Sequence, residues 1–175
     1  MIQIEQRASV VLYRFLVANC KDFHFLLPAN VCPVVPLTFL KAKIDFSFVD
    51  INPATHSGSF QEYLKSLEST GTEKKGVVIV NAYGYKQNCS DFYQSVRSLH
   101  PGMVIIEDNC LCIPETVKSE PSHLVDLELY STGSSKYAPI AEEVAMVFTM
   151  LISGSTAIIV NNNIMRRKIK RPFIT

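Results

Sequence analysis

The chain has 175 residues, the size of one ordinary domain, and 47% of them are hydrophobic while 19% are charged. This composition can fill a sizeable core, and it excludes wholesale disorder. The formal net charge of +1 gives no global attraction to nucleic acid or to an anionic surface, so we expect no nucleic-acid partner.

The cysteines and the N-terminal segment indicate where the protein resides. The five cysteines include no C-x-x-C pair and are odd in number, which argues against a disulfide framework or a zinc site. The four histidines are scattered and form no metal cluster. Residues 1–20 place an acid and an arginine before the apolar run, so we expect an amphipathic helix here and no signal peptide. The sequence therefore predicts a cytoplasmic protein without a metal site.

Apolar runs and helical periodicities alternate along the chain. Continuous apolar runs such as "GVVIVNAYG" predict buried strands, whereas the spacing of Phe60, Tyr63 and Leu67 predicts a helix. Ser90 or Asp91 is expected to cap a later helix. In chain order the prediction is helix 7–18, strand 23–29, helix 33–43, strand 44–51, helix 59–69, strand 76–84, helix 90–100, strand 103–108 and strand 124–132. Apolar strands separated by helices indicate an α/β fold, a parallel-dominated sheet with helices on both faces.

Residues 144–160, "VAMVFTMLISGSTAIIV", have two interpretations. The run carries no charge and a basic cluster follows it, which is the pattern of a membrane anchor. However, the run is short for a span, and its central "SGST" is typical of a hairpin turn between β-branched residues. We favour two buried strands over a membrane span. The basic cluster consists of Arg166, Arg167, Lys168, Lys170 and Arg171.

Polar residues follow the predicted strands at the points where the strands end. In parallel sheets, ligands bind outside the carboxyl ends of the strands. Taken singly, each such residue is more often a turn or cap residue than a catalyst. Their joint placement nevertheless predicts a ligand site at this edge of the sheet. The polar endings are residues 28–30, 50, 81–84, 107–108 and 131–136.

Asp108 and Lys136 have chemistries that belong together. The apolar residues 103–106 run directly into Glu107 and Asp108, and Lys136 ends a loop rich in serine and glycine. If Asp108 and Lys136 face one cleft, they suit pyridoxal phosphate (PLP). A lysine amine forms a Schiff base with its aldehyde, and a carboxylate keeps its ring nitrogen protonated. A hydroxyl-rich loop that contains glycine can also hold the phosphate.

Four stretches of the chain resemble the DegT/DnrJ-type sugar aminotransferases, which are PLP-dependent enzymes of fold-type I. They are "FLLPANVCPVVPLTFLKAKIDFSFVDINPAT", "VVIVNAYG", "VIIEDNC" and "LYSTGSSKY". No single motif is decisive, but four in the right order at natural distances make the match specific. The resemblance runs from about Arg7 to about Lys136, with a fainter similarity up to Asn163. It implies the large-domain fold of these enzymes.

The resemblance implies a role for five residues. Asp108 would pair with the ring nitrogen of PLP. Lys136 would form the Schiff base and then move a proton between substrate and cofactor. Ser131 would contact the phosphate, and Cys32 lies where the family places a residue over the face of the ring. Glu107 is expected to point away into a structural contact.

The resemblance also implies an activity and an assembly. The activity is the transfer of an amino group from an amino-acid donor, expected to be glutamate, to a keto-sugar nucleotide. Fold-type I sites form at a dimer interface, so a homodimer is implied. Residues 1–163 would form an incomplete large domain and residues 164–175 a basic tail. The small C-terminal domain of the family would be absent, since family members are usually more than twice as long.

Two departures from the family leave an alternative open. Glu5 and Gln6 stand where the family has a glycine-containing turn that holds the phosphate, and a carboxylate there opposes an anion. Leu111 stands where the family often has glutamine or histidine against the cofactor. The alternative is therefore a truncated, catalytically inactive relative that serves as a binding or partner subunit.

Two further alternatives have weaker support. A nucleotide-binding α/β protein without PLP lacks support because neither G-x-G-x-x-G nor G-K-[ST] occurs in the chain. A membrane-tethered α/β fragment rests only on the apolar residues 144–160.

Overall fold

The computed structural model describes residues 2–5, 7–84, 86–112, 124–131 and 145–148. The helices are α1 (Ala8–Asn19), α2 (Val34–Ala42), α3 (Phe60–Ser69) and α4 (Ser90–Leu99). The strands are β1 (Ile2–Glu5), β2 (His24–Pro28), β3 (Asp45–Val49), β4 (Ile51–Asn52), β5 (Ser57–Gly58), β6 (Lys75–Val80), β7 (Val104–Asp108), β8 (Leu127–Leu129) and β9 (Ala145–Phe148).

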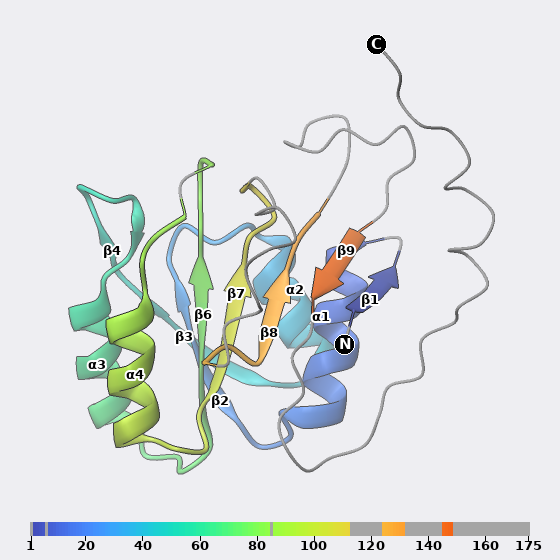
Figure 1. Cartoon of the computed structure of the whole chain (residues 1–175). Helices are drawn as coiled ribbons and strands as arrows, with labels where there is room; N and C mark the ends of the chain where they lie inside the picture. Colours follow the sequence, from blue (N-terminus) through green and yellow to red (C-terminus); the bar gives the residue numbers. More distant parts are fainter. Residues whose placement is uncertain (1, 6, 85, 113–123, 132–144, 149–175) are drawn as a thin grey trace, which may run out of the picture.

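Seven of the strands form one sheet in the order β1-β9-β8-β7-β6-β2-β3 (Figure 1). The five strands from β8 to β3 run parallel to one another, and β9 pairs antiparallel with both β8 and β1. The short strands β4 and β5 form a separate hairpin. The predicted α/β class with a parallel-dominated sheet is therefore confirmed.

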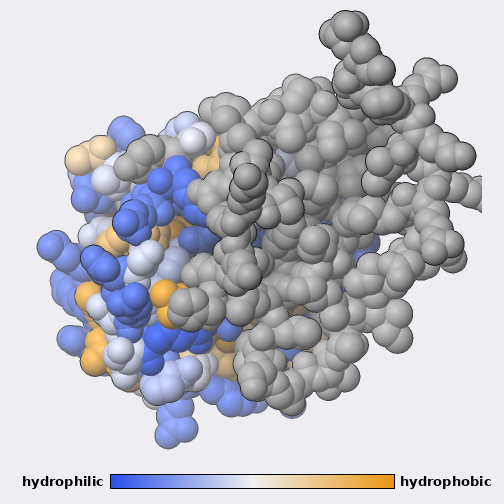
Figure 2. Space-filling model, viewed as in Figure 1, coloured by the Kyte–Doolittle hydropathy of each residue, from blue (hydrophilic) through white to orange (hydrophobic). Residues whose placement is uncertain are grey.

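Two hydrophobic cores lie on opposite faces of the sheet. One packs the sheet against α1 and α2 through residues such as Leu16, Phe39 and Ile106. The other packs it against α3 and α4 through residues such as Tyr63 and Val96. Figure 1 shows α3 and α4 side by side, away from α1 and α2, and Figure 2 shows mostly hydrophilic side chains on their side of the molecule. Helices on both faces bury the parallel strands, as such a sheet requires.

All nine predicted elements between residues 7 and 132 are present, but β1, β4 and β5 were not predicted. The pairing of Ile2 with Phe148 joins β1 to β9 across most of the sequence, and no local pattern reveals such a contact. The predicted cap at Ser90 or Asp91 is wrong. The N-cap of α4 is Cys89, and the Ser90 N–H donates to Oδ1 of Asn88 at 3.2 Å.

Part of the ambiguous apolar segment can be assigned. Residues 145–148 form β9, as expected for the first of two strands. Residues 149–175, including the rest of the apolar run and the basic cluster, lie outside the described residues. Within the described ranges, the structure contains no helix that is both long and apolar enough to cross a membrane.

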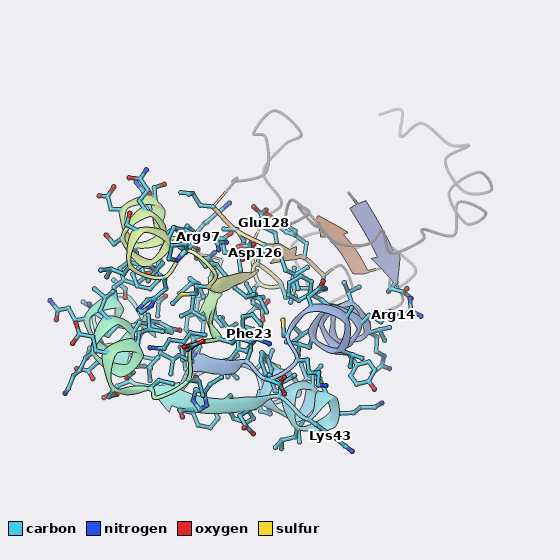
Figure 3. The ribbon with its side chains drawn as sticks, turned by 90° about the horizontal axis from the view of Figure 1, so that it is seen from below. Arg14, Phe23, Lys43, Arg97, Asp126 and Glu128 are labelled. Atoms are coloured by element: carbon cyan, nitrogen blue, oxygen red, sulfur yellow. The ribbon has the colours of Figure 1, made fainter. Side chains whose placement is uncertain are left out.

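A partly buried ion pair holds α4 against the amino ends of β7 and β8 (Figure 3). Nη2 of Arg97 lies 2.5 Å from Oδ2 of Asp126, and the same oxygen accepts the Ile105 N–H at 2.7 Å. Arg97 also donates to the carbonyl oxygens of Leu124 and Met103. Burial raises the pKa of Asp126, an effect that the Ile105 N–H and then Arg97 counteract. These charges satisfy one another at the edge opposite the polar strand endings.

A neighbouring aromatic ring leaves room only for glycine at position 76 in β6. It pairs with Phe25 of β2, and a Cβ atom added to Gly76 would lie 2.2 Å from Cε1 of that ring. Phe25 is fully buried and contacts Phe39 at 5.0 Å between ring centroids, so the ring has no room to move. A glycine inside a strand often marks such a close approach.

We therefore expect Gly76→Ala to lower the free energy of unfolding by about 1–3 kcal/mol, the usual cost of overpacking a core. Gly102→Ala is the matched control, since a Cβ there meets no atom within 4 Å, and its effect should stay within about 0.5 kcal/mol. Urea unfolding followed by circular dichroism measures both. Equal effects for the two variants would contradict this packing of Phe25.

Candidate functional site

The carboxyl ends of the parallel strands meet at one edge of the sheet, and Asp108 lies there at the end of β7. Its Cα is in register with Val80 of β6 and Leu129 of β8, and the residue is 7% exposed. Oδ1 of Asp108 accepts the Cys110 N–H at 3.0 Å. Oδ2 has no hydrogen-bond partner among the described residues. One carboxylate oxygen is thus anchored, and no described residue donates to the other.

Alternation along β7 separates the two carboxylates. Val104 and Ile106 belong to the core under α1 and α2, and Asp108 continues this series on the same face. Ile105 belongs to the core under α3 and α4, and Glu107 follows it on that face. Glu107 is only 4% exposed and makes the structural contacts expected of it, whereas Asp108 lies on the face of α1 and α2.

Glu107 begins a run of buried hydrogen bonds that we call the amide chain (Tyr93, Glu107, Asn109 and Asn81). The Tyr93 hydroxyl donates to Oε1 of Glu107 at 2.5 Å, and Nδ2 of Asn109 donates to Oε2 at 3.1 Å. Nδ2 of Asn81 then donates to Oδ1 of Asn109 at 2.6 Å. Oδ1 of Asn81 accepts the Gln87 N–H at 3.0 Å. The amide chain joins α4, the end of β7 and the loop after β6.

The sequence does not predict the amide chain, although residues 81 and 107 are expected at strand ends. Asn81 and Asn109 each follow the last residue of a strand, and both are completely buried. That β6 and β7 are neighbours is a property of the sheet order, and only this neighbourhood brings the two amides together.

Helix α1 begins at the same edge of the sheet, because it follows β1 and then runs back along one face of the sheet (Figure 1). Its N-cap is Arg7, which is exposed, has extended backbone and forms no side-chain cap. The first N–H groups of the helix are therefore not capped by this side chain. Glu5, expected to oppose a phosphate, forms an ion pair with Arg14 that offsets its charge. Gln6 lies outside the described residues.

The predicted site residues are brought together only in part. The Ser131 hydroxyl donates to the carbonyl oxygen of Cys110 at 3.4 Å, so Ser131 lies beside the loop that anchors Asp108. Cys32 is exposed and directly precedes Pro33, the N-cap of α2. Lys136 lies outside the described residues.

Two loops at the carboxyl edge of the sheet carry buried polar atoms that have no partner among the described residues. Nδ2 of Asn30 donates to the His56 carbonyl oxygen at 2.7 Å, but its Oδ1 is buried with no partner among the described residues. Nε2 of Gln87 is in the same situation. Tyr83 is 70% exposed with a left-handed backbone, and its ring meets that of His56 at 6.1 Å between centroids. Native structures leave few buried polar atoms unpaired, so this edge retains unused hydrogen-bonding capacity.

The described residues contain no group of three or more His, Cys, Asp and Glu side chains that could hold a metal ion. None of the five cysteines forms a disulfide bond. Among these residues, the site therefore consists of a half-anchored carboxylate, a hydroxyl and backbone N–H groups.

Comparison with known proteins shows the fold. No family model matches the sequence. No curated protein matches it either. Solved structures do match: NtdA from Bacillus subtilis with bound PMP, at a TM-score of 0.71 and 18% identity, is matched over 85% of this chain and 33% of its own. A sugar aminotransferase from Micromonospora echinospora matches at a TM-score of 0.68 and 17% identity, over 83% of this chain and 41% of that one.

A dehydratase shares the fold as well. E. coli GDP-4-keto-6-deoxy-D-mannose-3-dehydratase with bound hydrated PLP matches at a TM-score of 0.67 and 17% identity, over 85% of this chain and 39% of its own. The chain thus has the α/β fold of fold-type I PLP enzymes, and the resemblance to sugar aminotransferases is confirmed at the level of the fold. The chain spans well under half the length of these solved structures.

The surroundings of the thiols predict an order of reaction with a maleimide at pH 8. Cys32 is exposed and should react first. Burial raises the pKa of Cys20 to about 12 and that of Cys89 to about 11, so these two should react at least about 100-fold more slowly. Mass spectrometry of the labelled peptides measures the order.

Two controls test this order. Cys32→Ser should remove the fast phase, and unfolding in urea should expose all five thiols. A native Cys20 that reacts as fast as Cys32 would contradict the packing of α1 against the sheet.

Proposed function

We propose that this chain forms the cofactor-binding part of a PLP-dependent aminotransferase that acts on a keto-sugar nucleotide. The observation that carries the proposal is the Asp108 carboxylate, which lies at the carboxyl end of β7 with Oδ1 anchored and Oδ2 available. The solved structures that share the fold include PMP-bound and PLP-bound enzymes. Two of the matched proteins have names that refer to sugars, a sugar aminotransferase and a GDP-4-keto-6-deoxy-D-mannose-3-dehydratase. These likenesses support the proposal without identifying the substrate.

The residues of the edge fit a phosphorylated pyridine ring. Oδ2 of Asp108 is an acceptor suited to a protonated ring nitrogen, and burial strengthens such a charged hydrogen bond. The N-terminus of α1, with Arg7 beside it, offers N–H groups and positive charge to a phosphate. Ser131 offers a hydroxyl at the end of β8. When bound, PLP would supply an electron sink for the cleavage of a bond to the substrate carbon.

The protein's own residues would then divide the work. Asp108 would hold the proton of the ring nitrogen in place. Lys136 would retain the cofactor through Nζ and, once free, would carry a proton between carbon atoms of substrate and cofactor. Cys32, exposed at the start of α2, would border the face of the ring.

The finer features of the proposal rest on the resemblance. They are an amino-acid donor, expected to be glutamate, a homodimer, a large domain over residues 1–163 and a basic tail over residues 164–175. The cytoplasmic location rests on the odd number of cysteines and on the absence of a C-x-x-C pair in the sequence.

One observation favours a second candidate, a catalytically inactive relative that acts as a binding or partner subunit. The turn before α1 has Glu5 paired with Arg14 in place of a glycine-containing phosphate turn. The two candidates differ in whether the chain holds PLP covalently.

We expect the purified chain mixed with PLP to show a visible absorption band that borohydride reduction fixes onto Lys136. Lys136→Ala should abolish the fixed band, because no other amine is expected at that position. Lys65→Ala is the matched control, since Lys65 is an exposed lysine on α3. Peptide mapping after reduction measures the outcome. A wild-type chain without any band would favour the inactive relative.

Removal of the Asp108 charge should weaken PLP binding. Asp108→Asn keeps an oxygen for the Cys110 N–H but loses the charge that faces the ring nitrogen. The loss of a charged hydrogen bond, about 1.5–3 kcal/mol, corresponds to a Kd raised about 10- to 150-fold. Absorption titration measures Kd, and Asp45→Asn on the exposed edge strand β3 is the control. An unchanged Kd for Asp108→Asn would remove Asp108 from the cofactor site.

A further inference from the structure

Both neighbours of Asp108 in the sequence belong to the amide chain. Glu107 precedes it and Asn109 follows it, and the two side chains are bonded to each other at 3.1 Å. Both lie on the face of α3 and α4, opposite to Asp108. The backbone at Asp108 is also tied on both sides, because its carbonyl oxygen accepts the Asn81 N–H at 3.0 Å and the Asn109 N–H donates to Leu129 at 2.8 Å. A rotation of the Asp108 backbone would therefore break the amide chain.

The direction of the hydrogen bonds in the amide chain is determined at both ends. At one end, both oxygens of Glu107 accept: Oε1 from the Tyr93 hydroxyl and Oε2 from Nδ2 of Asn109. Burial, followed by the Glu107 charge, raises the pKa of Tyr93 well above its ordinary value, so this hydroxyl keeps its proton. At the far end, the Gln87 N–H can only donate, so Asn81 must present Oδ1 to it. Both ends impose the same orientation on the two amides.

The amide chain also holds the loop after β6 in place. Asn81 holds the Gln87 N–H through its side chain, and its carbonyl oxygen accepts from the Cys112 thiol at 3.2 Å. The loops that follow β6 and β7 are therefore joined to each other as well as to α4. The displacement of either loop would leave a buried polar group unpaired, which is costly.

We infer that Tyr93, Glu107, Asn109 and Asn81 are positioning residues that hold the Asp108 carboxylate at the angle needed to meet the ring nitrogen of the cofactor. This inference rests on the proposed function for the identity of the ligand. The side chains of Glu107 and Asn109 lie on the face of the sheet opposite to Asp108. The four residues act through the backbone of residues 107–110 and through the loop after β6.

Two tyrosines allow a matched test. Tyr93 and Tyr63 are buried on the same face of the sheet, and each donates one hydrogen bond: Tyr93 to Glu107, and Tyr63 to the Val78 carbonyl oxygen at 2.6 Å. Tyr93→Phe and Tyr63→Phe each remove one buried hydroxyl on this face, and that of Tyr93 also has a hydrogen bond with Cys89. Only the first belongs to the amide chain, so a general loss of stability affects both variants and a loss of positioning affects one.

The first readout needs no cofactor. We expect hydrogen exchange of the Cys110 N–H, which donates to Asp108, to be about tenfold faster in Tyr93→Phe and within about twofold of the wild type in Tyr63→Phe. The second readout is the Kd for PLP, which should rise roughly 3- to 10-fold in Tyr93→Phe and stay within about twofold in Tyr63→Phe. Asn81→Ala, which removes the far link, serves if Tyr93→Phe does not fold, and should speed exchange of the Gln87 N–H.

The two readouts separate the inference from the proposed function. A wild-type chain that does not bind PLP overturns the proposed function, while the exchange comparison still decides whether the amide chain holds Asp108. Unchanged exchange at Cys110 in Tyr93→Phe, or equal changes in both tyrosine variants, overturns the inference.

Discussion

The Glu107 carboxylate lies in the apolar interior at the end of β7, and the loops around it are arranged to supply its hydrogen bonds. A buried carboxylate is costly unless donors surround it. Tyr93 of α4 and Asn109 supply these donors directly, and Asn81 and the loop after β6 complete the chain. The carboxyl edge of the sheet therefore has a rigid polar layer beneath it, on the face of α3 and α4.

This polar layer supports the backbone at Asp108, whose side chain is not part of it. The two-residue period of the strand places this side chain on the other face, where Oδ1 is anchored and Oδ2 has no partner in the described part of the chain. At the opposite edge, Arg97 and Asp126 form an ion pair with each other. Asp126 also accepts the Ile105 N–H, so these charges have partners within the protein. A carboxylate with an available oxygen is thus found where parallel strands end, the usual location of ligand sites in this class of fold.

The sequence was informative about the elements and less informative about the site. Long apolar strands and periodic helices were predicted correctly because the pattern of each is contained in a few adjacent residues. The strand β1 was missed because its partner is β9, at the far end of the described chain. The cap of α4 was misassigned because Cys89, one position before Ser90, is the N-cap, and Asn88, two positions before Ser90, accepts the Ser90 N–H. For Lys136 the role remains a proposal from the sequence.

The sequence by itself determined the α/β class and the presence of two carboxylates at a strand end. It also determined that these carboxylates face opposite ways, since adjacent residues of a strand always do. Only the tertiary structure decided that β6 lies beside β7, and therefore that Asn81 meets Asn109. Sheet order depends on how helices and strands pack over long separations, and a local pattern carries no record of it. The residues that hold Asp108 in place could for this reason be recognised only in the folded chain.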